Sequence, residues 1–299
     1  MKKEERTINN CSNNDMKLPF DLDLKDKVAV VTGGGGVLCG MFAKALAKCG
    51  AKVAILDLNL EAADAVAQDI IKDGGQAKGY MANVLDIDIM KSVRDQIAAD
   101  FGTCDILING AGGNNPKGTT TKEYLYPEDL KGVDEITTFF DLDPNGISFV
   151  FNLNFLGTLI PTQVFARDMA EDGKGCIVNI SSMNAFCPLT KIPAYSGAKA
   201  AVSNFTQWLA VHFSKVGIRV NAIAPGFFIT NQNRGLLINP DGSYSERAGK
   251  IISQTPMSRF GEAEELIGTL QFLVNEEAAS FVNGVVIPVD GGFAAYSGV

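Results

Sequence analysis

The stretch VAVVTGGGGVL, residues 28–38, runs from five strand-type residues through four consecutive glycines into the start of a helical pattern. Its β-branched residues favour a strand. The glycines permit a tight turn, which lets backbone N–H groups at the start of the following helix approach a pyrophosphate. The stretch therefore predicts the first strand–turn–helix unit of a dinucleotide-binding α/β domain.

The rest of the chain repeats this alternation of short apolar runs and longer helical patterns, which is typical of a parallel sheet with crossover helices. We expect strands at Lys27–Thr32, Lys52–Leu56, Ala77–Met81, Ile106–Asn109, Cys176–Ile180, Ile218–Ile223 and Val285–Val289. We expect helices at 38–49, 60–73, 86–101, 147–172, 194–216 and 262–275. Several strands are nearly all apolar, as strands covered on both faces are. These patterns predict one doubly wound, Rossmann-type α/β domain over residues 19–299, preceded by a flexible tail over 1–18.

Two long connections interrupt the alternation, at residues 113–146 and 227–258. Each follows the carboxyl end of an expected strand, and ligands of open α/β sheets bind at that edge. Long irregular connections in compact domains are often functional lids. We therefore interpret both connections as substrate-binding insertions.

Composition excludes several classes of partner and site. The net charge of −8 argues against nucleic-acid and anionic-membrane partners, since both favour a basic surface. The six cysteines are scattered and the chain has one histidine, so neither a metal site nor a disulfide framework is expected. The first 18 residues lack the apolar segment of a signal peptide, and the cysteine usage fits a reducing cytoplasm.

Asp57 ends the second expected strand, 21 residues after Gly36. A carboxylate there can accept hydrogen bonds from the adenosine ribose hydroxyls and repel a 2′-phosphate. The glycine turn contains no Arg or Lys, and neither do the two residues after Asp57. NAD is therefore the expected cofactor, in preference to NADP.

Tyr195 and Lys199 lie four residues apart, on one face of an expected helix. A phenol with a pKa of about 10 is a poor base near neutrality. An ammonium at ~4 Å contributes roughly 4 kcal/mol at an effective dielectric constant of ~20, which would lower the phenol pKa by about three. Such a pair is suited to exchanging a proton with an alcohol.

Other motifs lie at matching positions along the chain: Asn109-Gly110-Ala111-Gly112, Asn154-Phe155-Leu156-Gly157, Asn179-Ile180-Ser181-Ser182, and Asn221-Ala222-Ile223-Ala224-Pro225-Gly226 with Thr230 beyond. In their order and spacing, residues 20–292 resemble the short-chain dehydrogenases/reductases. The resemblance implies that Tyr195 is the general acid/base, that Lys199 lowers its pKa and holds the nicotinamide ribose, that Ser182 orients the substrate oxygen, and that Asn154 holds a water in a proton relay.

The same resemblance implies a set of cofactor-binding residues: Gly33, Gly35, Gly36, Val37, Leu38, Asp57, Leu58, Asn83, Val84, Asn109, Gly110, Ala111, Ile180, Tyr195, Lys199, Pro225, Gly226, Phe228 and Thr230. Three positions depart from the family pattern. Val37 and Cys39 stand where the second and third glycines of the cofactor turn are usual, which puts the pyrophosphate geometry in question. Asn83 stands where Asp is commoner, and it keeps a hydrogen-bonding side chain. The family resemblance also implies a homotetramer, with the helices at 147–172 and 194–216 packed across a dimer interface.

Within the family, the two long connections are similar to those of the bacterial D-mannonate oxidoreductases of the short-chain type. A small anionic sugar acid is therefore the expected substrate. Such a molecule needs a cation for its carboxylate and polar groups for its hydroxyls, and a steroid or acyl-thioester pocket would be more apolar. The candidate substrate residues are Asn114, Lys117, Ser182, Asn184 and Arg234, with Lys191, Asn231 and Gln232 nearby in the sequence.

Two alternatives remain open from the sequence. One is an NAD-dependent dehydrogenase of another sugar acid or polyol, such as a gluconate dehydrogenase. The other is a dinucleotide-binding module without catalysis, which is disfavoured because Tyr195, Lys199, Ser182 and Asn154 are all present. His212 shares an apolar helix with Trp208, and we interpret it as structural.

Overall fold

A seven-stranded parallel sheet forms the centre of the computed structural model, which describes residues 18–132, 135–230 and 233–298. The strand order is β3-β2-β1-β4-β5-β6-β7, and every neighbouring pair is parallel. The strands are β1 (Val28–Thr32), β2 (Lys52–Asp57), β3 (Gln76–Met81), β4 (Ile106–Asn109), β5 (Gly175–Ile180), β6 (Ile218–Pro225) and β7 (Val286–Val289). The order changes direction between β1 and β4, which is where this fold places its ligands. The predicted doubly wound α/β fold is confirmed.

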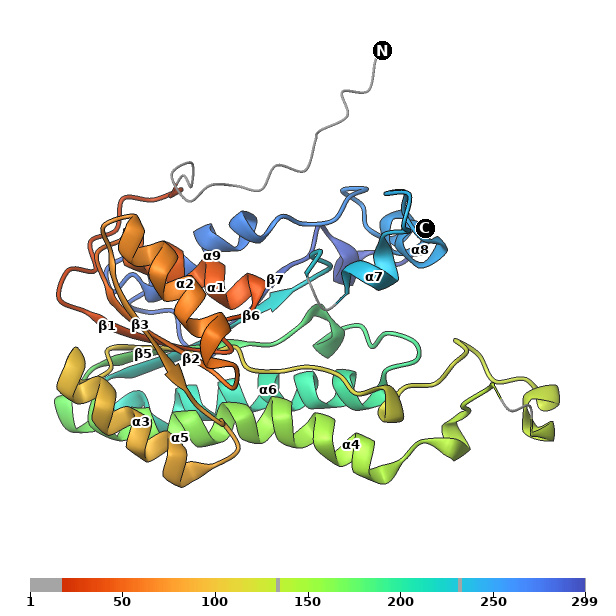
Figure 1. The fold of residues 1–299 in the computed structure, drawn as a ribbon, viewed down its shortest axis with the longest axis horizontal. Coiled ribbons are helices and arrows are strands. Elements are labelled where there is room, and N and C mark those ends of the chain that lie inside the picture. The colour runs from red at the N-terminus through yellow and green to blue at the C-terminus, as the bar shows by residue number, and fades with distance from the viewer. Residues whose placement is uncertain (1–17, 133–134, 231–232, 299) are drawn as a thin grey trace, which may run out of the picture.

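Helices cover both faces of the sheet (Figure 1). One face packs against α1 (Val37–Lys48), α2 (Leu60–Lys72) and α9 (Ile267–Val274). The other packs against α3 (Ile87–Asp100), α5 (Gly157–Asp172) and α6 (Pro193–His212). The central strands are buried along their whole length, since both of their faces are covered.

The longest helical segment, Pro144–Asp172, consists of α4 (Pro144–Phe151), a π-helical turn η5 (Asn152–Leu156) and α5. It is long and apolar enough to cross a membrane by length and composition alone. However, half of its most apolar window is buried inside the molecule, and α5 contributes Val164, Phe165 and Met169 to the core. This segment is a core helix of the α/β domain.

In its described residues, the first long connection contains short 3-10 turns at Pro116–Gly118, Pro127–Lys131 and Phe139–Asp141 before α4 begins, and it extends away from the sheet (Figure 1). The second connection is more ordered than expected, because it contains α7 (Arg234–Leu237) and α8 (Glu246–Gln254). Ser245 caps α8 by accepting the N–H of Ala248. Ile251 and Ala248 then bury one face of α8 in a small separate core, which explains why this helix forms.

Candidate active site

The glycine turn is packed closely against its neighbours at the carboxyl edge of the sheet. Gly33 adopts a φ of +66°, and a Cβ there would lie 2.9 Å from Ala111 Cα. A Cβ on Gly34 would lie 2.6 Å from Ile55 Cγ2. Both positions therefore require glycine. The tight turn that these glycines allow leads directly into α1, so that backbone N–H groups lie at the start of the helix. The resulting cradle fits a dinucleotide pyrophosphate.

The two departures from the family glycine pattern have different structural consequences. Val37 is the first residue of α1 and is partly exposed. Cys39 is buried beneath the turn and faces Gly110, because a Cβ on Gly110 would lie 2.1 Å from Cys39 Sγ. Burial raises the pKa of the Cys39 thiol to about 12, with nearby Lys199 opposing that change. The cysteine is therefore a neutral packing residue whose volume is accommodated by Gly110.

This close contact predicts a specific incompatibility. Gly110→Ala should lower the free energy of unfolding by about 1–3 kcal/mol, because overpacking a filled site strains its neighbours. Cys39→Ala should restore part of that loss in the double variant, since it removes the sulfur that the new methyl group would meet. Denaturant unfolding of the two single variants and the double variant measures the coupling. Equal effects of Gly110→Ala in both backgrounds would show that the two positions do not interact.

Asp57 is fixed beside the same turn. Its Oδ2 accepts the N–H of Gly35 at 3.1 Å, and its Oδ1 accepts the N–H of Asn59 at 3.0 Å. Leu58 between them is largely exposed. The carboxylate is therefore held at the end of β2 with a defined orientation, as a ribose-binding carboxylate needs to be.

Several other predicted cofactor residues have structural roles of their own. Asn109 is buried, and its Nδ2 donates to Thr162 Oγ1 and to Asn179 Oδ1, both at 2.9 Å. The hydroxyl of Thr32 accepts the N–H groups of Gly110 and Ala111 at 3.0 and 3.2 Å. These bonds tie β1, β4, β5 and α5 together below the predicted cofactor site.

The remaining predicted cofactor residues lie around the same edge. Val84 is buried against Gly157 of α5, and Asn83 caps its own turn by accepting the N–H of Leu85. Pro225 ends β6 and is buried, as is Phe228, which bridges to Gly261. The segments after β3, β4, β5 and β6 thus lie at the carboxyl edge, as the sequence predicts.

Asn154 occupies the π-helical turn and is fully buried. Its Nδ2 donates to the carbonyls of Val150 and Gly113, at 2.8 and 2.7 Å, and its Oδ1 accepts the N–H of Gly113 at 3.3 Å. A Cβ on Gly112 would lie 2.6 Å from Asn154 Oδ1 and 3.2 Å from Lys199 Nζ. Asn154 and Lys199 therefore approach each other across Gly112, which has no room for a side chain.

Lys199 is buried on α6, and its Nζ donates to the carbonyl of Ile180 at 2.7 Å. Desolvation lowers the pKa of Lys199 to about 8, and nearby Cys39 is a smaller influence in the opposite direction. Because β5 supplies the carbonyl and α6 supplies the amine, this bond joins the strand before Ser182 to the helix that carries Tyr195.

Tyr195 lies on the same helix, with its ring centroid 5.7 Å from Lys199 Nζ. Desolvation raises the pKa of the Tyr195 phenol, and a hydrogen bond with Ser182 offsets only part of this change. The expectation that Lys199 lowers the pKa of the Tyr195 phenol is wrong, because in this structure the pKa is raised. The physical reason is that the ammonium is directed to the Ile180 carbonyl, while burial of the phenol dominates.

The sequence analysis did not identify Ser181, which supports the helix that carries Tyr195 and Lys199. The hydroxyl of Ser181 donates to the carbonyl of Lys199 at 3.2 Å and pairs with Ser203 Oγ at 2.7 Å. The paired serines at 181 and 182 gave no indication that the first would support α6. A second feature was also missed, because Lys250 Nζ lies 3.4 Å from Glu123 Oε1 and so links α8 to the first long connection.

The predicted substrate residues fall into different environments. Asn184 is buried two residues after Ser182. Asn114 Nδ2 donates to Thr119 Oγ1 at 3.1 Å, and Lys117 Nζ lies 3.7 Å from Asp143 Oδ2, so both stabilise their own connection. Arg234 begins α7, is exposed, and forms no ion pair within the described part of the chain. Lys191 is half-buried at a φ of +73° just before α6, while Asn231 and Gln232 lie outside the described residues.

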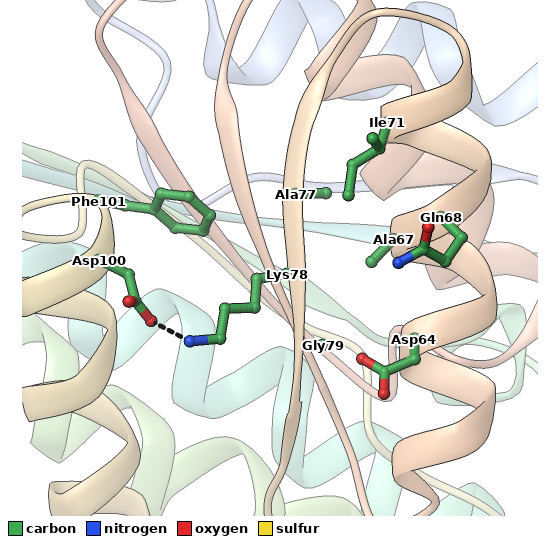
Figure 2. A pocket seen from close by; sticks show the side chains of 9 residues that line it. All are labelled: Asp64, Ala67, Gln68, Ile71, Ala77, Lys78, Gly79, Asp100 and Phe101. Atoms are coloured by element: carbon green, nitrogen blue, oxygen red, sulfur yellow. Dashed lines mark hydrogen bonds and ion pairs between the residues drawn. The ribbon is translucent and has the colours of Figure 1, made fainter.

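A surface hollow at the β3 edge of the sheet is separate from the residues around Tyr195 and Lys199 (Figure 2). It lies beside the edge strand β3, between α2 and α3, and Lys78 pairs with Asp100 across it at 2.7 Å. Its other lining residues include Asp64, Gln68 and Phe101. Nothing in this hollow resembles the arrangement around Tyr195.

Comparison with known proteins gives consistent results. The chain matches the short chain dehydrogenase family over residues 27–239. It is 62% identical over 284 residues to an uncharacterized oxidoreductase of Haemophilus influenzae, covering 95% of this chain and 99% of that protein.

Solved structures agree with this match. A proposed D-mannonate oxidoreductase from Haemophilus influenza, with bound NAD, has a TM-score of 0.88 at 62% identity and covers 93% of this chain and 98% of its own. A gluconate 5-dehydrogenase from Burkholderia cenocepacia, in complex with NADP and tartrate, has a TM-score of 0.77 at 29% identity, with coverage of 92% and 98%.

Proposed function

Because the chain belongs to the short-chain dehydrogenase family, we propose that it is an NAD-dependent oxidoreductase that interconverts D-fructuronate and D-mannonate. The reaction is D-fructuronate + NADH + H⁺ ⇌ D-mannonate + NAD⁺. One observation carries the proposal of catalysis: Tyr195, Ser182, Lys199 and Asn154 converge at the sheet edge that also holds the glycine cradle and Asp57. The similarity to a proposed D-mannonate oxidoreductase with bound NAD supports the substrate.

The glycine turn and Asp57 would hold the dinucleotide, which when bound would provide hydride-transfer chemistry at the reacting carbon. The hydroxyls of Ser182 and Tyr195 hold the substrate oxygen between them. In the reductive direction, the Tyr195 phenol gives its proton to the oxygen as negative charge develops there. Asn154 holds the loop at Gly113 in place, and Lys199 is held beside Gly112 by its bond to the Ile180 carbonyl.

The choice of cofactor is expected to depend on Asp57. Wild-type enzyme should prefer NADH to NADPH, because the fixed carboxylate repels a 2′-phosphate and accepts bonds from a ribose hydroxyl. Asp57→Ser should narrow this preference by about tenfold or more, since a hydrogen bond to a charged group contributes ~1.5–3 kcal/mol. The measurement is kcat/KM with each cofactor. Equal wild-type values for NADH and NADPH would contradict the assignment.

Arg234 is the proposed partner of the substrate carboxylate. Its guanidinium can form two parallel hydrogen bonds to a carboxylate, whereas Lys117 is a point charge that already pairs with Asp143. Arg234→Met should raise the KM for the sugar acid by about tenfold or more and leave the Kd for NADH almost unchanged. Lys117→Met is the matched comparison, with a smaller expected effect. An unchanged KM in the Arg234 variant would assign this residue to the solvated surface.

The decisive experiment is the initial rate of NADH oxidation with D-fructuronate beside a panel of other keto-acids and keto-sugars. The proposal expects the highest kcat/KM with D-fructuronate. A higher value with a keto-gluconate would favour the second candidate, a gluconate dehydrogenase, which the similarity to the gluconate 5-dehydrogenase supports. No turnover with any substrate, together with tight NADH binding, would indicate a binding module.

The proposal includes a cytoplasmic homotetramer, as the family resemblance implies. The outer face of α6 supports assembly, because Trp208 and Val211 are 54% and 77% exposed. Large apolar side chains gathered on one exposed helix face are typical of an interface.

A further inference from the structure

Asn184 belongs to a short 3-10 turn (Met183–Ala185) that begins directly after Ser182. Its backbone N–H donates to Ser182 Oγ at 3.3 Å, so the catalytic hydroxyl and Asn184 are held within one hydrogen bond of each other. The turn packs against α6, which carries Tyr195, and against the C-terminal turn Phe293–Ala295. Asn184 therefore lies in the wall of the active site, next to the group that holds the reacting oxygen.

Asn184 is 4% exposed, and its side-chain Oδ1 has no hydrogen-bond partner in the described part of the chain. A buried acceptor left unpaired costs about 1–3 kcal/mol, and folded proteins rarely keep one without a reason. The described residues contain three other buried side-chain atoms without a partner, the oxygens Asn109 Oδ1 and Ser196 Oγ and the donor Arg219 Nη1. Asn109 ends β4 with its amide nitrogen bonded to Thr162 and Asn179, and Ser196 and Arg219 lie within α6 and β6. Asn184 differs in lying in the turn that carries the Ser182 hydroxyl out of the sheet.

We propose that Asn184 Oδ1 accepts a hydrogen bond from a substrate hydroxyl on the carbon next to the reacting carbon, and that it thereby selects polyhydroxylated substrates. This inference rests on the proposed function and adds a specificity residue to it. Ser182 and Tyr195 hold the oxygen of the reacting carbon, and Asn184 is bonded to Ser182 through its backbone. The group nearest to Asn184 is therefore a substituent of the adjacent carbon.

The chemistry of the acceptor restricts the kind of group that can satisfy it. A carbonyl-type oxygen needs a donor, so it pairs with a hydroxyl and not with a carboxylate or a second keto oxygen. In D-fructuronate, the keto carbon is flanked by a CH₂OH group and a CHOH group, so a donor is available on either side. A substrate that lacks this hydroxyl leaves the buried oxygen unpaired, and sites of this kind discriminate strongly against such analogues.

The test compares D-fructuronate with its two deoxy analogues, each of which lacks one of the two hydroxyls next to the ketone, and the analogue with the lower activity is then used for the comparison of variants. Wild-type kcat/KM should be at least about tenfold higher for the hydroxylated compound, since ~1.4 kcal/mol corresponds to tenfold. In Asn184→Leu, which has similar size and no acceptor, this ratio should fall towards one. Asn184→Ala should show the same loss of discrimination, and the Kd for NADH should be unchanged in both variants.

The possible outcomes separate this inference from the proposed function. If the enzyme prefers another sugar acid or polyol, the proposed substrate is wrong, and the ratio is measured with that compound and its deoxy analogue. A ratio that stays at its wild-type value in Asn184→Leu and Asn184→Ala overturns the role of Asn184. An equal loss of activity towards both compounds would assign Asn184 to the support of Ser182, which also contradicts the inference.

Discussion

Replacing Tyr195 by Phe is expected to lower turnover by at least ~10²-fold and to leave the Kd for NADH and the fold unchanged. The variant keeps the ring and its packing beside Lys199 and removes only the hydroxyl. Because burial raises the phenol pKa, the group is protonated at neutral pH and can donate a proton in the reductive direction. Initial rates with the preferred substrate and a fluorescence titration with NADH measure the two effects.

Tyr80→Phe is the matched control for this experiment. The Tyr80 hydroxyl bonds to Asp100 at 2.7 Å beside the edge strand, away from the catalytic group. That variant should keep wild-type turnover, although it loses a hydrogen bond. Near-wild-type turnover in Tyr195→Phe would remove Tyr195 from the mechanism.

The raised phenol pKa also predicts opposite pH dependences for the two directions. Reduction uses the protonated phenol, so its rate should not increase as the pH rises above neutrality. Oxidation of the alcohol needs the phenolate, so its rate should increase with pH until the raised pKa is reached. The profiles are measured as kcat in each direction with saturating cofactor.

The fold could be predicted from the sequence because each strand has a simple local pattern. β1 and β4 are apolar runs that end in a polar residue, and β5 is apolar apart from Asn179 and is followed by Ser181. The observed bounds of all three differ from the predicted ones by one residue at most. Helix α8 was not predicted, because its apolar residues are few and only pair with α7 and Phe260 once the connection is folded. Its stability comes from tertiary packing, which a local pattern does not reveal.

The grouping of Tyr195, Lys199 and Asn154 at one edge of the sheet could be predicted because their spacing along the chain is fixed by the elements that carry them. The direction of the pKa change of Tyr195 could not be predicted from the sequence, since it depends on burial of the phenol and on where the Lys199 ammonium is directed. The pairing of Cys39 with Gly110 was also out of reach. The two residues are 71 positions apart, and their contact arises from the packing of α1 against the loop after β4.

Lys199→Met is expected to have two separable effects. The first is functional: the variant should lose at least ~10²-fold in turnover and bind NADH more weakly, because the ammonium supports the proton transfer and is expected to contact the nicotinamide ribose. The second concerns stability. A buried lysine with a pKa of about 8 holds fewer protons in the folded protein than in the unfolded chain at alkaline pH.

The sign of the stability effect follows from the lowered pKa. Between pH 8 and 10.5 the unfolded chain binds more protons at this position, so this group stabilises the wild-type fold increasingly as the pH rises through that window. Below pH 8 that contribution is absent. The Met variant lacks it at every pH, so its stability relative to wild type should be most favourable at pH 7 and should fall by about 2 kcal/mol by pH 9.5.

Denaturant unfolding at pH 7, 8.5 and 9.5 measures this difference, with Tyr195→Phe as the control. That variant is expected to lose turnover as well, but it retains the buried amine, so it should keep the pH dependence that Lys199 gives to the wild type. A constant stability difference between Lys199→Met and wild type at all three pH values would show that Lys199 titrates as it does in the unfolded chain. In that case the buried bond to Ile180 would hold a charged ammonium throughout, and desolvation would not be the dominant influence on this group.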